Sequence, residues 1–202
     1  MKRILLMFLC LGMVLSLGAT DASAIGLGLG IDMGSGDADV TIDGLPAGTN
    51  DIETTDFGFV LDTNLSGDST FNYRLTLAAA GMEFKDTSFD SLNGITIVND
   101  FGFGIVKNSN FRLWMGPELR LSWLDQTTDS GSELDLFSFG FGPVIGANFN
   151  IGSTVTLSLT GAYIFHTTNG EYYSSFSGWW YDFESDGENL ILGAHLLFRL
   201  NE

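Results

Sequence analysis

The sequence predicts an all-β protein, an eight-stranded antiparallel up-and-down transmembrane β-barrel. Three observations lead to this prediction: apolar residues alternate with small or polar ones, long and short connections alternate between these segments, and the face opposite the large side chains is rich in glycine. The stretch FSFGFGPVIGANFN at 137–150 combines the alternation and the glycines. A soluble strand would carry Lys, Thr or Glu on its second face, so the sparse face here needs a different explanation.

Eight segments with a period of two residues follow one another, whereas no stretch after residue 24 has the apolar period of a helix. The predicted strands are 25–33, 55–65, 70–84, 94–107, 111–123, 136–149, 154–166 and 189–200. The predicted short turns are 66–69, 108–110 and 150–153, and the predicted long loops are 34–54, 85–93, 124–135 and 167–188. All tight turns then lie at one end of the meander, as in transmembrane barrels with short periplasmic turns and long outer loops.

Two closed barrels share this strand pattern. In a lipocalin-like soluble barrel the large side chains point inward, whereas in a membrane barrel they contact lipid and the glycines line the lumen. The interior of an eight-stranded barrel is only just wide enough for side chains, and more than thirty large apolar residues would overfill it. Lys85 and Lys107 are the only lysines after residue 24, too few for a soluble surface. The large side chains are therefore predicted to face lipid.

Aromatic residues are expected at both ends of the lipid-facing surface, as interfacial girdles. Phe71, Phe111 and Phe149 lie beside the short turns. The opposite row consists of Phe57, Trp123, Phe137, Tyr163 and Phe165. Closure of the sheet is also required, because unpaired backbone groups cannot remain in hydrocarbon.

The first 24 residues have the features of a secretory signal peptide. A basic MKR start, an apolar run and an Ala22-Ser23-Ala24 cleavage site follow one another. The only cysteine, Cys10, lies inside the apolar run, so no disulfide is expected in the exported chain. We predict a signal peptide at 1–24 and an outer-membrane β-barrel domain at 25–202.

The charge balance excludes several partners. The formal net charge is −17, and loss of Lys2, Arg3 and Asp21 with the signal peptide leaves 6 basic against 24 acidic residues, or −18. This balance argues against nucleic acid and against docking onto anionic lipid through a basic patch. A composition that is 45% hydrophobic with 17 Phe is too apolar for a disordered acidic chain. Acidic and apolar residues must therefore be segregated in space.

The signal peptide, the eight alternating strands and segments such as GFGPVIGANF and WMGPELRLSW resemble the small outer-membrane β-barrel superfamily, the OmpA/OmpX-type barrels. The resemblance covers the whole chain after the signal peptide and implies this fold and an outer-membrane location. It rests on pattern and implies no catalytic residues. Members usually end with an aromatic residue as part of the signal for the assembly machinery, whereas this chain ends FRLNE. Either Phe198 or Leu200 serves in its place, or the chain uses a truncated or divergent signal.

An ion network is predicted in the lumen. Asp62 and Arg74 are roughly equidistant from the turn at 66–69, so they should be inward-facing neighbours on adjacent strands. Asp100, Glu118 and Arg120 are expected on the same side. The network would fill and stiffen the barrel, because buried charge must be paired. The alternative is a gate at Arg120 in a narrow conduction path.

The first predicted loop contains a partial calcium motif. Asp39, Thr41, Asp43 and Gly44 resemble the start of a calcium-binding loop, but Asn50 stands where the closing Glu should be. A solvated acidic loop is one interpretation, and weak binding of a divalent cation is the other. No cofactor is expected.

The last predicted loop, within 167–188, is dense in aromatic residues. The candidate binding surface comprises Tyr172, Tyr173, Trp179, Trp180 and Tyr181. Exposed aromatic residues at this density often mark binding surfaces. The alternative is a hairpin whose rings pack on one another.

The segment FHTTNGE at 165–171 is similar to the H-x-S-N segment of the outer-membrane lipid A deacylases. The resemblance would make His166 a base and Thr168 a nucleophile, with Glu171 or Glu184 completing a triad. Threonine in place of serine and an inward-facing His166 depart from that family. His195 is expected to be a hydrogen-bonded lumen residue.

The sequence thus predicts a non-enzymatic integral outer-membrane protein with a structural or surface-interaction role through acidic, aromatic outer loops. A narrow pore or conduit for small molecules is the alternative, and a lipid A-modifying hydrolase is a remote one. Expected partners are outer-membrane lipid, lipopolysaccharide and the outer-membrane assembly machinery, with the outer ligand left open.

Overall fold

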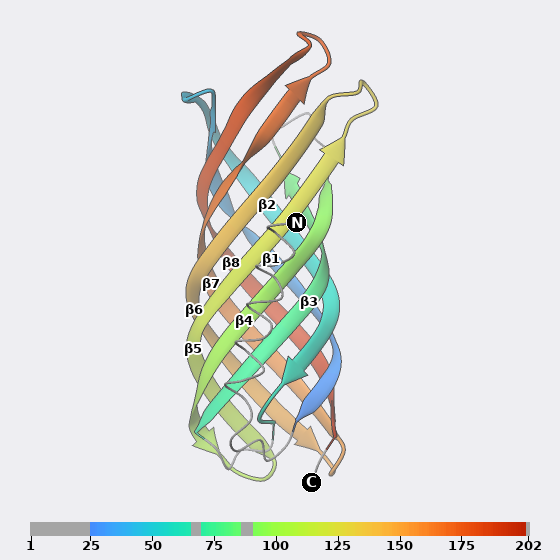
Figure 1. Cartoon of the computed structure of the whole chain (residues 1–202). Helices are drawn as coiled ribbons and strands as arrows, with labels where there is room; N and C mark the ends of the chain where they lie inside the picture. Colours follow the sequence, from blue (N-terminus) through green and yellow to red (C-terminus); the bar gives the residue numbers. More distant parts are fainter. Residues whose placement is uncertain (1–24, 66–69, 86–90, 201–202) are drawn as a thin grey trace.

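The computed structural model describes residues 25–65, 70–85 and 91–200, and these form one closed barrel (Figure 1). The predicted signal peptide, the turn at 66–69 and residues 86–90 of the predicted loop 85–93 lie outside the described residues. The strands are β1 Gly26–Ile42, β2 Leu45–Asp62, β3 Phe71–Phe84, β4 Leu92–Lys107, β5 Phe111–Thr127, β6 Glu133–Ile151, β7 Val155–Ser174 and β8 Trp179–Arg199. No helix in the described ranges is long and apolar enough to cross a membrane.

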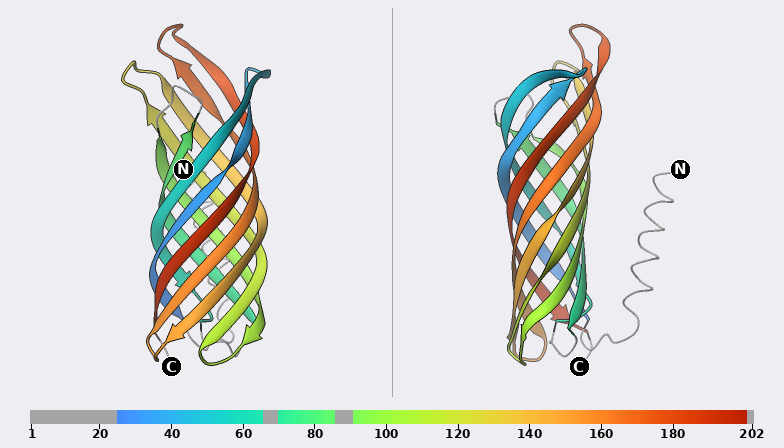
Figure 2. Two further views of the ribbon diagram at one scale, coloured as in Figure 1. Left: turned by 180° about the vertical axis from the view of Figure 1, so that it is seen from behind. Right: turned by 90° about the vertical axis from the view of Figure 1, so that its left-hand side faces the viewer.

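Each strand pairs antiparallel with its neighbour in the sequence, and β1 closes the barrel on β8. The closing pair runs from Gly26↔Arg199 to Ile42↔Phe183, and the Leu200 amide donates to the Ile25 carbonyl at 2.8 Å. The views from behind and from the side show tilted strands around the whole circumference (Figure 2). The predicted fold class, an eight-stranded up-and-down barrel, is confirmed.

The predicted outer loops were wrong in extent, because most of their residues continue the strands. The predicted loop 34–54 is a hairpin that turns at Asp43 and Gly44, and most of 167–188 belongs to β7 and β8. Asp43 and Gly44 have φ of 50° and 74°, and Ile42 pairs with Leu45. This geometry fits a two-residue type I′ turn, for which Asp-Gly is a strong signal.

Inward and outward side chains alternate along the whole of each strand, but the kind of residue on each face changes partway along. The outward face changes from apolar to acidic, and the inward face changes from polar to apolar. On β8, Leu196, Leu192 and Leu190 point outward, and the next outward positions are Glu188, Asp186 and Glu184. The inward face changes in the opposite sense, from His195 to Phe183. The same exchange occurs on β1, where outward Ile31 and Met33 give way to Asp37 and Asp39. Both strands therefore leave an apolar environment and enter water at this point.

The outward side chains on the membrane part form an apolar band. Exposed residues of the band include Leu29, Phe59, Leu77, Phe103, Met115, Phe139, Phe141, Ile145, Leu159 and Leu192. Aromatic pairs lie at both edges: Phe71–Phe103 and Phe111–Phe149 at the short-turn end, and Trp123–Phe137 and Tyr163–Phe165 at the other. The large side chains face outward, as the membrane orientation requires, so the lipocalin-like alternative is excluded.

A charge placed on the band tests this orientation. Ile145→Arg should lower the free energy of unfolding by about 2–4 kcal/mol, because an arginine near the bilayer midplane loses its hydration. Asn169→Arg adds the same charge on the outward face of β7 beyond the band, and should cost about 1 kcal/mol or less. Urea unfolding of the protein in phospholipid vesicles measures both values. Equal costs at the two positions would contradict the assigned band.

Candidate functional site

Arg74 occupies the centre of the polar lumen. Its Nε and Nη2 atoms donate to one oxygen of Asp62, at 3.0 and 2.8 Å, and both side chains are fully buried. Nη2 also donates to Ser158 Oγ at 2.9 Å and to Asn148 Oδ1 at 3.3 Å. One guanidinium therefore joins β2, β3, β6 and β7 across the lumen. The structure places Asp62 and Arg74 opposite one another on adjacent strands, which is the predicted relation.

His195 connects this group to a second one. Its Nδ1 lies 3.2 Å from Arg74 Nη1, and its Nε2 lies 3.0 Å from Asp32 Oδ1. A guanidinium can only donate, so Nδ1 accepts and Nε2 carries the proton donated to Asp32. His195 is thus the hydrogen-bonded lumen residue that was expected.

Arg120 holds three carboxylates. Its Nε donates to Glu118 at 3.1 Å, its Nη1 donates to Asp56, and its Nη2 lies 3.7 Å from Asp32. Asp56 was missed in the sequence, although it shares the inward parity of Gly58 and Asp62 on β2. The two groups form one continuous set of contacts through His195 and Asp32. We call this set the lumen network, and its members are Asp32, Asp56, Asp62, Arg74, Glu118, Arg120 and His195.

Asp100 lies beside the lumen network without joining its ion pairs. It is opposite Arg74 on β3 and opposite Glu118 on β5, and its side chain is buried. Within the described residues its Oδ1 has no hydrogen-bond partner. Toward the short-turn end, Arg112 donates to the Asn64 carbonyl at 3.1 Å and to Asn72 Oδ1 at 3.2 Å.

Trp114 fills the lumen next to Arg74. The guanidinium carbon of Arg74 lies 5.0 Å from the centroid of the indole, and Nε1 donates to Asn148 Oδ1 at 3.3 Å. The ring lies against Gly146, where an added Cβ would approach its atoms to between 2.2 and 2.7 Å. Glycine is therefore needed on this wall to make room for a fully buried indole.

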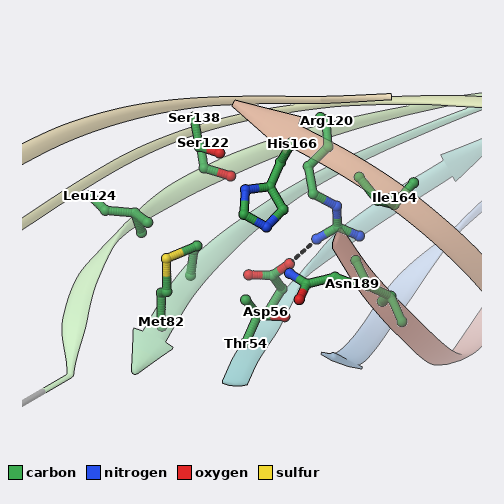
Figure 3. A pocket seen from close by; sticks show the side chains of 14 residues that line it. Thr54, Asp56, Met82, Arg120, Ser122, Leu124, Ser138, Ile164, His166 and Asn189 are labelled. Carbon is green, nitrogen blue, oxygen red and sulfur yellow. Dashed lines mark hydrogen bonds and ion pairs between the residues drawn. The ribbon is translucent and has the colours of Figure 1, made fainter. Parts of the chain in front are cut away.

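A small cavity lies beyond the lumen network, toward the outer end (Figure 3). It has a volume of about 30 Å³ and is bounded by Asp56 and Arg120 on one side and by Met82 and Leu124 on the other. Both ring nitrogens of His166 lack a hydrogen-bond partner among the described residues. The space suits one ordered water molecule, since such a site needs polar partners and little volume.

The outer end of the lumen is filled by apolar side chains, which we call the outer apolar cluster. Its buried members are Ala38, Val40, Ile52, Ala80, Met82, Phe84, Leu92, Leu124, Leu134, Leu136 and Phe183. Phe84 and Phe183 make an edge-to-face contact at 6.1 Å, and Tyr172 packs against the cluster. The cluster therefore closes the end of the lumen opposite the short turns.

The partial calcium motif does not form a loop. Asp39 and Thr41 belong to β1, and Asp43 and Gly44 form the turn. Asp39 accepts a hydrogen bond from Thr49 at 2.5 Å, and Asp43 Oδ1 accepts one from the Asp182 amide at 2.9 Å. Within the described ranges, no three His, Cys, Asp or Glu side chains are grouped to hold a metal ion. The loop interpretation of this motif was wrong, because the Asp-Gly step makes a hairpin turn.

The residues that resemble a lipid A deacylase site do not come together as a catalytic triad. His166 and Thr168 both point inward, and the Thr168 hydroxyl donates to Ser138 Oγ at 2.9 Å. Glu171 and Glu184 are exposed on the outward face. The carboxylates of Glu171 and Glu184 therefore lie on the opposite face of the sheet from the imidazole of His166 and the hydroxyl of Thr168.

The five aromatic residues predicted as a binding surface lie on one hairpin. Tyr172 and Tyr173 are on β7, and the other three are on β8. Tyr172 stacks on Tyr181 at 6.0 Å, and Tyr173 packs on Trp180 at 5.1 Å. Trp179 is 71% exposed. The rings therefore pack in cross-strand pairs and still leave aromatic surface in water.

Carboxylates dominate the outward surface beyond the apolar band. Asp37 is opposite both Asp51 and Glu188, and Asp125, Asp135, Glu171 and Asp182 lie opposite one another on successive strands. Lys85 contacts Glu53 at 2.7 Å and Glu83 at 3.3 Å. The hydrogen bond to Glu53 raises the pKa of Lys85 above its ordinary value.

Comparison with known proteins supports the architecture. No protein-family model matches the chain, and no curated protein matches it. The outer membrane protein OprG from Pseudomonas aeruginosa aligns over 92% of this chain and 99% of its own, with a TM-score of 0.58 and 11% identity. The outer membrane protein AlkL, solved in DMPC bilayers, aligns over 91% of this chain and 93% of its own, with a TM-score of 0.52 and 12% identity. At such identities the likeness establishes the fold.

A third solved structure, the outer membrane protease OmpT from Escherichia coli, aligns over 91% of this chain and all of its own. Its TM-score is 0.45 and its identity 8%, which is too low to carry an activity to this chain.

Removal of one charged partner from the lumen network should be strongly destabilising. Arg74→Met leaves Asp62 buried without its partner, so we expect a loss of about 3–5 kcal/mol in the free energy of unfolding. Lys85→Met removes an exposed cation from its pairs and should leave this free energy nearly unchanged. Urea unfolding in vesicles, followed by heat-modifiable migration on gels, compares the two. A small effect of Arg74→Met would mean that the lumen ion pairs contribute little.

The packing of Trp114 can be tested at Gly146. Gly146→Ala should destabilise the barrel by about 1–3 kcal/mol, because the new methyl group overlaps the indole. Gly161→Ala is the matched control, since the nearest side-chain atom to its added Cβ is 3.7 Å away. The same unfolding assay applies. If both variants were equally stable, the lumen beside Trp114 would be less tightly filled than described.

Proposed function

We propose that this small eight-stranded outer-membrane β-barrel has a structural or surface-interaction role and presents an acidic, aromatic extension to the outside of the cell. The observation that carries the proposal is the filled lumen. The lumen network and Trp114 occupy the membrane part, and the outer apolar cluster occupies the extension. A filled lumen supports a role that requires no passage through the barrel.

The part of the barrel beyond the apolar band, which we call the outer extension, supports the proposed surface-interaction role. On β8, Trp179 at the hairpin end lies eleven positions before Leu190, which is at the edge of the band. At about 3.3 Å per residue and a tilt of about 40°, the hairpin rises roughly 25 to 30 Å beyond the band. The β7–β8 hairpin is the tallest part of the barrel in Figure 1. With an apolar core of its own, the extension is a rigid platform for contacts outside the cell.

The same surfaces indicate the membrane partners. The apolar band and its aromatic edges would contact acyl chains of lipid and lipopolysaccharide. The outer-membrane assembly machinery would insert the barrel, with exposed Phe198 and Leu200 at the end of β8 available for recognition. We further propose that the protein is not an enzyme, consistent with the separation of His166 from Glu171 and Glu184.

A narrow pore is the second candidate function, and the polar cavity beside Arg120 is the observation that favours it. Polar side chains of Asp56, Arg120 and His166 line this cavity in the middle of the barrel. Passage would still require the outer apolar cluster to open.

Single-channel recording in planar lipid bilayers separates the two functions. We expect no stepwise current from the wild-type barrel or from Arg120→Ala, because the outer apolar cluster closes the lumen in both. A current that rises in Arg120→Ala would instead identify Arg120 as a gate and overturn the structural role. Mass spectrometry of lipid A from cells that express the protein should show unchanged lipid A.

A further inference from the structure

The end of the β7–β8 hairpin projects beyond its neighbours. The last register pair with β6 is Glu133↔Tyr173, and the last with β1 is Ile42↔Phe183. The segment between Tyr173 and Phe183 therefore has no flanking strand, and it forms the tip that stands highest in both views of Figure 2. A partner outside the cell meets this part of the barrel first.

The tip exposes more aromatic surface than a solvated turn needs. Phe176 is fully exposed, Trp179 is 71% exposed and Trp180 is 51% exposed. The outward pair Tyr173–Trp180 is held by ring contact at 5.1 Å, with the rings inclined at 44°. An exposed aromatic patch with fixed geometry is typical of a contact surface.

A row of carboxylates lies directly beneath this ring pair on the same outward face. Glu171 and Asp182 are opposite each other on β7 and β8, two residues from Tyr173 and Trp180. Asp135 on β6 is opposite Glu171, and Glu133 is opposite Tyr173. Like charges directly opposite one another destabilise a sheet. Among the described residues, none of these four carboxylates lies within 4.0 Å of a cationic group, so the repulsion is uncompensated.

We propose that this face binds an arginine-bearing segment of another protein. Residues two apart on a strand are about 7 Å apart, and opposite residues are about 5 Å apart. One guanidinium can therefore stack on the Tyr173–Trp180 pair and donate to Glu171 or Asp182. Arginine suits the site better than lysine, because its planar group both stacks on rings and forms bidentate bonds to carboxylates. The inference deepens the proposed surface-interaction role and rests on it.

Two other kinds of ligand fit the face less well. The tip lies too far from the apolar band to insert into its own bilayer, by the roughly 25 to 30 Å derived above. A neutral sugar would stack on the rings, but it would leave the four carboxylates without a counter-charge. The charge of −17 over the whole chain also disfavours phosphate-bearing ligands.

The test uses the full chain in detergent micelles and calorimetric titration with hexaarginine. The double variant Tyr173→Ala/Trp180→Ala and the double variant Glu171→Gln/Asp182→Asn should each weaken hexaarginine binding about tenfold. Asp37→Asn/Asp51→Asn is the matched control, because it neutralises another exposed cross-strand pair with the same change in net charge. This control should change the affinity less than about twofold. Phe176→Ser removes an exposed ring outside the pair and should behave like the control.

Three results would overturn the inference. They are an absence of hexaarginine binding, an equal loss in the Asp37→Asn/Asp51→Asn control, and preferential binding of maltohexaose or hexaglutamate. Heat-modifiable migration confirms that each variant is folded. A barrel that carries no current but fails to bind hexaarginine would retain the proposed structural role. A conducting barrel that binds hexaarginine would lose that role and keep the arginine site.

Discussion

Every backbone amide and carbonyl in the membrane part of this protein must find its partner within the chain, because hydrocarbon offers none. The pairing of β1 with β8, from Gly26↔Arg199 to Ile42↔Phe183, meets this constraint by removing both sheet edges. Once the sheet is closed, successive side chains of a strand point alternately outward to lipid and inward to the lumen. The narrow lumen then accepts glycine, small polar residues and a few paired charges, and the large side chains face acyl chains.

The barrel contains two cores of opposite chemistry on one continuous set of strands. Within the membrane the lumen network joins β1, β2, β3, β5 and β8 through buried ion pairs and His195. Beyond the membrane the same inward positions hold the outer apolar cluster, and the outward positions hold carboxylates. The inward face stays buried throughout, but the medium outside changes from lipid to water. The outer part is therefore stabilised as a soluble β-protein is, by burial of apolar surface.

These two cores connect the fold with the proposed role. A lumen that is filled apart from the small cavity beside Arg120 makes the barrel a rigid anchor, and the outer core makes the extension rigid as well. The β7–β8 hairpin then displays its aromatic pairs and carboxylates at a fixed height above the membrane. Many of the acidic residues lie on the outward face of this extension, where water solvates them.

The sequence by itself determined the number of strands, their antiparallel order and the face that meets lipid, because a period of two residues is a local property of the chain. The relation of Asp62 to Arg74 was also predictable, since one short turn joins their strands. The strand ends were not predictable, because the acidic residues after Met33 and before Leu190 look like loop residues. Only the structure shows that the inward Val40 and Phe183 belong to the outer apolar cluster. Only the tertiary structure decided the links Arg120–Asp56 and Asp32–His195 and the packing of Trp114 on Gly146. These contacts depend on the register of the strands around a closed and tilted sheet. The register brings together residues as far apart in the sequence as 163 positions, and no local pattern encodes it.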